Sequence, residues 1–215
     1  MGHFDLVIFD NDGVLVDSEA YANQILTDLL LEYGFAMTRD ECTATFLGRT
    51  LAAVREWAEP RRGRALPRDF EDRYHHQLFD VFRTSLTAVP GVAATIDRIA
   101  IPNCVASSGT HERIRLALTT TGLLARFEGR IFSAQDVARG KPEPDLFLHA
   151  AQTLGIRPER CAVIEDSPLG VEAANRAHMT AFGFARMTPA ERLRDATGGV
   201  FTSMDELPAL LGRAH

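Results

Sequence analysis

Two carboxylates stand close together, directly after an apolar run near the start of the chain. Asp10 and Asp12 follow the run that begins at Phe4, and Gly13 permits a tight turn in the segment that carries them. Both side chains can therefore face one small site, where carboxylates hold a hard cation or exchange protons. A solvated acidic turn would also explain this segment if it stood alone.

Hydroxyl groups and a glycine follow a second apolar run. Ser107, Ser108, Gly109 and Thr110 lie between that run and a helical pattern that starts at His111. A strand, then small polar residues, then a helix N-terminus can make an anion site from backbone N–H groups and the Ser107 hydroxyl. For this segment alone, a simple N-cap is the alternative.

Lys141 is the only lysine in a chain that has 23 basic residues, since all the others are arginine. It follows Gly140, and Pro142 and Pro144 after it fix the entry to a helix. A compact ammonium charge on such a rigid loop could balance the charges of a phosphate and an aspartate. A surface lysine is the alternative, and the uniqueness of Lys141 speaks against it.

Glu165 and Asp166 end another apolar run, which begins at Cys161. Ser167 as N-cap and Pro168 at the first helical position explain why a helix starts there. They do not explain two acids at the end of a buried strand, since an isolated buried carboxylate is costly. We expect these carboxylates to coordinate a cation.

All four segments are expected at the carboxyl edge of one parallel sheet, where ligands of open α/β sheets bind. Together they supply carboxylates for a hard cation, donors for an anion and one lysine. In proteins, Mg²⁺ prefers a few carboxylates completed by substrate phosphate and water. The set therefore predicts a Mg²⁺ site that receives a phosphate group.

The elements that position these residues are short apolar runs that alternate with helical patterns. Each run is nearly continuous, as in strands that are buried on both faces. In one helical pattern, apolar residues from Leu146 to Leu154 keep one face before Gly155 ends the helix. Such alternation predicts an α/β fold with a doubly wound parallel sheet. The expected strands are 4–10, 103–107, 130–133, 161–165 and 180–184, with a weaker one at 199–202.

Residues 18–86 differ, since they contain helical stripes and no convincing strand. One stripe runs from Ala22 to Tyr33 and another from Phe70 to Phe82, with a loop expected at 61–64. We therefore expect an all-helical cap domain inserted into an α/β core. The expected boundaries are 1–15 and 88–215 for the core and 16–87 for the cap.

At these residues the sequence resembles the haloacid dehalogenase-like (HAD) hydrolase superfamily, over nearly the whole chain. The nearest likeness is to the branch with a helical cap inserted after the first motif, which includes sugar-phosphate phosphatases and β-phosphoglucomutase. The resemblance implies a Rossmann-like core, a bound Mg²⁺ ion and phosphoryl transfer through an aspartyl-phosphate. It also implies a cap that closes over the site and excludes bulk water.

The resemblance also assigns roles to individual residues. It makes Asp10 the nucleophile and Asp12 the general acid and base, whose backbone carbonyl also binds Mg²⁺. Ser107, with Ser108 beside it, and Lys141 would hold the phosphoryl group. The metal ligands that it implies are Asp10, Asp12, Asp166 and Glu165.

Other activities of the family fit these residues less well. A dehalogenase needs no metal and no second acid, so Asp12 opposes that activity. A phosphonatase needs a cap lysine, and residues 16–87 contain none. β-Phosphoglucomutase has a histidine on the first cap helix, and the matching residue here is Ala22. The sequence favours a phosphatase, with a β-phosphoglucomutase-like mutase as the alternative. A non-catalytic binding module would have lost Asp10 or Asp12.

The choice of substrate depends on less specific features. Arg49 lies in a short cap segment where this branch places a substrate-contacting loop, and its guanidinium could bind a hydroxyl, a carboxylate or a second phosphate. A solvated loop arginine is the alternative. By family analogy alone, the partner is a small phosphorylated metabolite, namely a sugar, sugar acid or polyol phosphate. The sequence does not specify the oligomeric state.

The composition of the chain bears on its possible macromolecular partners and on its cellular compartment. With 46% apolar and 24% charged residues, the chain has the composition of a soluble globular protein. Its formal net charge of −6 argues against a nucleic-acid partner, which needs a basic footprint. No run approaches the roughly 20 apolar residues that span a membrane. The scattered cysteines Cys42, Cys104 and Cys161 predict reduced thiols in a cytoplasmic protein.

Overall fold

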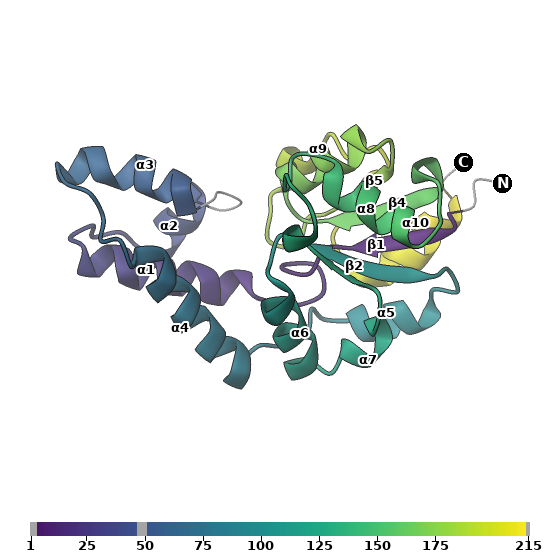
Figure 1. Cartoon of the computed structure of the whole chain (residues 1–215), viewed down its shortest axis with the longest axis horizontal. Coiled ribbons are helices and arrows are strands. Elements are labelled where there is room, and N and C mark those ends of the chain that lie inside the picture. The colour runs from purple at the N-terminus through teal and green to yellow at the C-terminus, as the bar shows by residue number, and fades with distance from the viewer. Residues whose placement is uncertain (1–3, 47–50, 214–215) are drawn as a thin grey trace. The chain divides into compact units, whose positions relative to one another are not determined.

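The computed structural model describes residues 4–46 and 51–213 (Figure 1). The chain forms two compact units. The core unit consists of Met1–Asp17 and Leu86–His215, and the helical unit of Ser18–Ser85. The sequence-based division put the boundaries at 15/16 and 87/88, so the helical unit is slightly shorter than expected at both ends.

Among the described residues, one sheet of six parallel strands forms the centre of the core unit, in the order β3-β2-β1-β4-β5-β6. The first strand lies in the middle and the chain winds outward from it in both directions. The doubly wound fold is therefore confirmed, and every strand falls on a predicted apolar run. The strands are β1 (Leu6–Phe9), β2 (Asn103–Ser107), β3 (Ile131–Ser133), β4 (Cys161–Glu165), β5 (Thr180–Phe184) and β6 (Val200–Phe201).

Helices cover both faces of this sheet (Figure 1). Leu6 and Ile8 of β1 belong to the apolar cluster that includes the buried faces of α8 and α9. Alternate residues point to the other face, where Phe9 packs edge-on against Phe127 with ring centroids 6.2 Å apart. The helices of the core unit are α5 (Val92–Arg98), α6 (His111–Thr120), α7 (Leu124–Phe127), α8 (Asp145–Thr153), α9 (Pro168–Arg176) and α10 (Leu207–Arg213), and short 3₁₀ turns occupy Ala134–Asp136, Pro158–Arg160, Ala190–Leu193 and Met204–Glu206.

The ends of α8 and α9 agree with the predicted signals. The Ser167 hydroxyl accepts a hydrogen bond from the Gly170 N–H, and Pro168 takes the first position of α9. Gly155 follows α8 in the left-handed region, with φ of 71°, which ends the helix. Ser167 and Pro168 thus place the start of α9 next to the carboxyl edge of the sheet, where the site residues were expected.

The helical unit contains no strand among its described residues. Its helices bury apolar stripes against one another, with Leu29 of α1 and Phe82 of α4 both fully buried. The two predicted stripes are therefore confirmed, and Gly34 follows α1 with φ of 92°. The helices are α1 (Glu19–Glu32), α2 (Arg39–Phe46), α3 (Leu51–Arg62) and α4 (Phe70–Thr84).

Arg61 and Arg62 were expected in a loop, and this prediction is wrong. Both residues belong to the last turn of α3. The Arg61 guanidinium lies over the Trp57 ring, 4.5 Å from its centroid, and donates a hydrogen bond to the Trp57 carbonyl at 2.7 Å. The helix therefore extends two residues further than expected, and Gly63 then ends it with φ of 70°.

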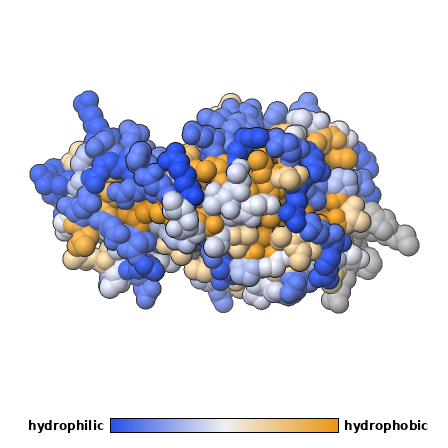
Figure 2. Space-filling model, turned by 90° about the horizontal axis from the view of Figure 1, so that it is seen from below, coloured by the Kyte–Doolittle hydropathy of each residue, from blue (hydrophilic) through white to orange (hydrophobic). Residues whose placement is uncertain are grey.

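On the face in Figure 2, hydrophilic residues surround patches of hydrophobic ones. In the described part of the chain, no helix is long and apolar enough to cross a membrane. All three cysteines are buried and free of disulfides. The large apolar side chains that are exposed lie on separate elements, namely Leu31, Leu148, Met187 and Val200.

The two segments that connect the units are paired with each other inside the core unit. Val16 and Ala88 form an antiparallel bridge, and the Asp17 N–H donates to the Thr87 carbonyl at 2.9 Å. The Asp17 carboxylate accepts two further bonds from Arg186, at 3.0 and 2.7 Å. Because Arg186 follows β5, this ion pair ties the exit from the core unit to the sheet.

We expect Asp17→Asn and Arg186→Gln each to lower the free energy of unfolding by about 1–2 kcal/mol, because the pair is bidentate and only 23% and 26% exposed. The double variant should lose less than the sum of the two single losses. Denaturant unfolding of the four proteins measures this. Arg160→Gln is the matched control, since it breaks a bidentate but more exposed pair with Asp5, and a smaller loss is expected. Additive losses at Asp17 and Arg186 would contradict the coupling.

Candidate active site

The centre of the site is the ammonium group of Lys141. Its Nζ lies 2.6 Å from Oδ1 of Asp10 and 2.7 Å from Oε1 of Glu165. It also donates to the Ala106 carbonyl at 3.2 Å, and only 5% of the side chain is exposed. The loop before α8 thus places the single lysine between residues at the ends of β1, β2 and β4.

The register of the sheet explains this meeting. Phe9 of β1 pairs with Val105 of β2 and with Ile164 of β4. The next residue, Asp10, donates its backbone N–H to the Ile164 carbonyl at 3.0 Å. Parallel pairing therefore aligns Asp10 with Glu165 at one edge of the sheet, although the two lie far apart in sequence.

Both oxygens of the Glu165 carboxylate are engaged by donors of this chain. Oε1 receives Lys141, and Oε2 receives the backbone N–H and the hydroxyl of Ser167, both at 2.9 Å. The side chain is 1% exposed. A Cβ on Gly170 would lie 1.8 Å from Oε1, so α9 needs glycine at this position. In the structure Glu165 is a buried partner of Lys141, and its expected role as a metal ligand stays a prediction.

Burial is the largest influence on the charges at this centre. It raises the pKa of Asp10 to about 7, an effect that Lys141 opposes and that Glu165 and Asp12 reinforce. Burial lowers the pKa of Lys141, but the attraction of Asp10 and Glu165 outweighs it, so the net shift of the Lys141 pKa is upward. Lys141 therefore stays cationic beside the two carboxylates.

Asp166 lies against the turn that carries Asp12. Gly13, with φ of 77°, allows this turn, and a Cβ there would lie 2.0 Å from Oδ2 of Asp166. Only 7% of Asp166 is exposed. A side chain on residue 13 would therefore displace the Asp166 carboxylate, so glycine is needed both for the backbone angle and for the space.

Asp12 pairs with a residue that the sequence did not mark as functional. Nη2 of Arg113 donates to Oδ1 of Asp12 at 2.9 Å, and the two side chains are 19% and 22% exposed. Arg113 lies in the first turn of α6, where its N–H donates to the hydroxyl of the N-cap residue, Thr110. The only sequence feature that could have indicated Arg113 is that it is a basic residue in the turn after the Ser-Ser-Gly-Thr segment.

Ser107 and Ser108 take different positions at the end of β2. Ser107 is buried, and its hydroxyl accepts the Gly109 N–H at 3.1 Å. Ser108 is exposed. The carbonyl of Gly109 accepts the Ser133 hydroxyl at 2.6 Å, which links this loop to β3. The phosphate-binding role of the two serines stays a prediction. Arg49, expected to contact substrate, lies outside the described residues.

The carboxylates at this edge of the sheet could hold a metal cation that also binds the substrate. Four carboxylates, of Asp10, Asp12, Glu165 and Asp166, accompany two cationic side chains, of Lys141 and Arg113, which leaves an excess of two negative charges. Within residues 4–46 and 51–213, no three His, Cys, Asp or Glu side chains are grouped to hold a metal alone. A metal here would need main-chain, water or substrate oxygens as well, as Mg²⁺ prefers.

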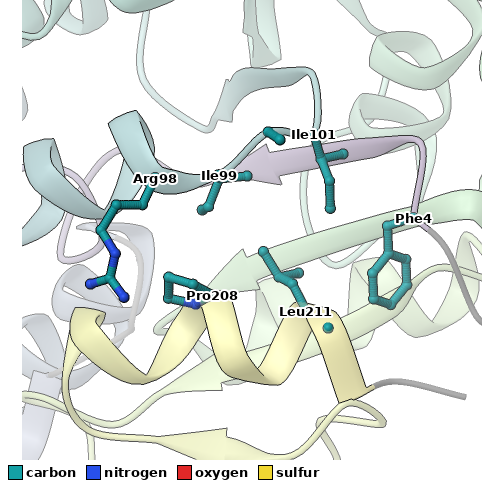
Figure 3. Close-up of a pocket in the computed structure, with 8 residues that line it drawn as sticks. Phe4, Arg98, Ile99, Ile101, Pro208 and Leu211 are labelled. Carbon is teal, nitrogen blue, oxygen red and sulfur yellow. The ribbon is translucent and has the colours of Figure 1, made fainter.

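A separate cavity lies at the opposite edge of the sheet (Figure 3). Its volume is about 200 Å³, and Phe4, Ile101 and Leu211 are among the residues that line it. Phe4 precedes β1 and Ile101 precedes β2, so the cavity lies at the amino ends of these strands. It is therefore not part of the carboxylate cluster.

An open parallel sheet with buried carboxylates and a lysine at its carboxyl edge has the arrangement of an α/β enzyme. The sequence model of the haloacid dehalogenase-like hydrolases matches residues 4–178. The chain therefore belongs to this hydrolase family, which confirms the resemblance seen in the motifs.

Similar proteins support the membership over the whole chain. The 6-phosphogluconate phosphatase of Escherichia coli is 28% identical over 211 residues, which cover 98% of this chain and 96% of that protein. Hexitol phosphatase A of the same organism is 31% identical over 169 residues, which cover 76% and 75%. A crystal structure of a haloacid dehalogenase-like protein of unknown function from Agrobacterium tumefaciens has a TM-score of 0.90 and 35% identity, covering 97% of this chain and 98% of that one. Both named relatives are phosphatases.

We expect Gly170→Ala to lower the free energy of unfolding by about 1–3 kcal/mol, although alanine favours a helix, because the new methyl group overlaps the pinned Glu165 carboxylate. Gly212→Ala in α10 is the control, since no atom lies within 4 Å of the added carbon, and no loss is expected there. Urea unfolding of both variants measures the difference. Equal stability of the two would contradict the close packing of Glu165.

Proposed function

We propose that this chain is a Mg²⁺-dependent phosphatase that hydrolyses a small phosphorylated metabolite through an aspartyl-phosphate on Asp10. The observation that carries the proposal is the buried contact of Lys141 with Asp10 and Glu165. Family membership supports it, and so do the relatives named for 6-phosphogluconate and hexitol phosphates. The substrate class that we propose is a sugar, sugar acid or polyol phosphate.

The residues proposed to hold Mg²⁺ are Asp10, Asp166 and the backbone carbonyl of Asp12. The excess negative charge of the cluster and the close approach of Asp166 to Gly13 support this set. Glu165 is assigned instead to Lys141, because both its oxygens accept hydrogen bonds from this chain. When bound, Mg²⁺ supplies positive charge that offsets the repulsion between phosphate and carboxylate.

Asp10 and Asp12 then perform two displacements. In the first, a carboxylate oxygen of Asp10 bonds to phosphorus while the bond to the leaving oxygen breaks, and Asp12 gives that oxygen a proton. In the second, a water oxygen bonds to phosphorus, the bond to Asp10 breaks, and Asp12 takes the water's proton. Lys141 reduces the repulsion between Asp10 and the anionic substrate in both steps. Ser107 and Ser108 are proposed to hold the phosphoryl oxygens.

The mutase remains the second candidate in this family branch. A mutase must keep water from the aspartyl-phosphate while its sugar reorients. The position that carries a histidine in β-phosphoglucomutase is Ala22, in the first turn of α1, and alanine cannot exchange a proton. This residue favours hydrolysis.

We also propose that the protein is cytoplasmic and that Arg49 contacts the leaving group.

We expect Asp10→Asn to abolish phosphate release while the protein stays folded, because one atom changes and the nucleophile is lost. The measurement is phosphate released from a panel of sugar, sugar-acid and polyol phosphates that includes 6-phosphogluconate and β-glucose 1-phosphate. Steady turnover by folded Asp10→Asn would exclude Asp10 as nucleophile. Glucose 6-phosphate formed from β-glucose 1-phosphate faster than free phosphate would establish a mutase instead.

We expect activity to require Mg²⁺ and Ca²⁺ to inhibit, because Ca²⁺ accepts more ligands and can engage both oxygens of Asp10. Asp166→Ala should raise the Mg²⁺ concentration for half-maximal activity by at least about tenfold. Glu165→Ala should lower turnover and change that concentration less. Titration of Mg²⁺ against activity, after treatment with a chelator, measures both. Full activity in the chelator would refute the metal requirement.

A further inference from the structure

We propose that Arg113 is a positioning residue that orients the Asp12 carboxylate for proton transfer. The inference rests on the proposed function, because it takes Asp12 as the general acid and base. Arg113 and Asp12 are separated by 101 positions in the sequence, and their contact is made entirely within the core unit. No sequence motif of the site included Arg113.

The position of Arg113 follows from the start of α6. Its backbone N–H donates to the Thr110 hydroxyl at 3.2 Å, which fixes the first turn of the helix beside the end of β2. Its Cδ atom would lie 3.6 Å from a Cβ on Gly109, so the side-chain stem passes close to this glycine. The guanidinium then reaches Asp12, which lies in the turn after β1, and β1 is the neighbour of β2 in the sheet.

A fixed backbone at Asp12 does not by itself fix the direction of the Asp12 carboxylate. The Gly13 N–H donates to the Val16 carbonyl at 2.9 Å, and Asp12 itself bridges Val16, so the turn is fixed. Its carboxylate is 22% exposed, and rotation about χ1 and χ2 would move its oxygens away from the leaving group. Proton transfer needs a separation of about 2.6–3.2 Å between the two oxygens.

A guanidinium suits this role better than another donor. It is planar, always charged and unable to accept a proton, so it orients a carboxylate without exchanging protons with it. With Oδ1 held by Arg113 at 2.9 Å, the Asp12 carboxyl group is oriented to give its proton to the leaving oxygen as the P–O bond breaks. The same carboxylate later receives the proton of the attacking water, and Arg113 keeps its own protons throughout.

The test compares leaving groups that differ in their need for a general acid. p-Nitrophenolate leaves readily without a proton, whereas phenolate is the anion of a phenol with a pKa of about 10 and needs one. Arg113→Gln should lower kcat/KM for phenyl phosphate by about 10–100-fold and for p-nitrophenyl phosphate by less than about threefold, with KM nearly unchanged. Arg113→Lys should recover part of the loss, because it keeps a charged donor but not the planar geometry.

Arg115→Gln is the matched control. Arg115 lies on the same helix and pairs with Glu128 at 2.9 Å, in an exposed position outside the carboxylate cluster. It should retain wild-type values with both substrates, and thermal melting checks that each variant is folded. If Arg113→Gln does not fold, Arg113→Lys provides the same comparison with a smaller expected ratio.

Two results would overturn the inference. An equal loss with both phosphate esters would mean that Arg113 has a general structural role. A rise in KM with unchanged kcat would mean that Arg113 binds the substrate and does not orient Asp12. Both results leave the proposed function intact, because the wild-type enzyme still hydrolyses the esters. If the wild-type enzyme releases phosphate from neither ester nor the metabolite panel, the proposed function fails, and the role of Arg113 fails with it.

Discussion

The buried ammonium of Lys141 is the interaction on which the site depends. A buried cation without a partner would cost several kcal/mol, and two adjacent carboxylates without a cation would repel each other. Lys141 lies within 2.7 Å of both Asp10 and Glu165, so removal of the lysine would leave two buried carboxylates without their shared cation. The parallel register of β1 and β4, the loop before α8 and the bare face of Gly170 are all needed for this contact.

The segment after β1 carries the proposed acid and also leads out of the core unit. It carries Asp10 and Asp12, and a few residues later, at Asp17, the chain leaves the core unit. Two arginines hold its carboxylates from different elements: Arg113, after β2, binds Asp12, and Arg186, after β5, binds Asp17. One short segment, from Asp10 to Asp17, therefore carries both the proposed acid and the exit from the core unit.

Much of the fold could be predicted from the sequence, because the signals are local. Apolar runs, helix stripes and terminal glycines act over a few residues, and they located all six described strands to within two residues. The prediction was wrong at Arg61 and Arg62, where a stacked Trp57 ring extends α3. The contact joins residues four apart on one helix, so it was a local signal that the prediction of a loop at 61–64 did not take into account.

The sequence by itself determined which residue types stand at the carboxyl edge, since a parallel sheet brings its strand ends to one place. It thereby predicted Asp10, Lys141 and Asp166 as site residues, and it indicated the hydrolase family to which the chain belongs. Only the tertiary structure decided how the charges are paired. It assigned Glu165 to Lys141 and Arg113 to Asp12, contacts across 24 and 101 positions. Pairing depends on distances of about 3 Å, because charge-assisted hydrogen bonds act only at that range, and such distances are set by packing across the whole sheet.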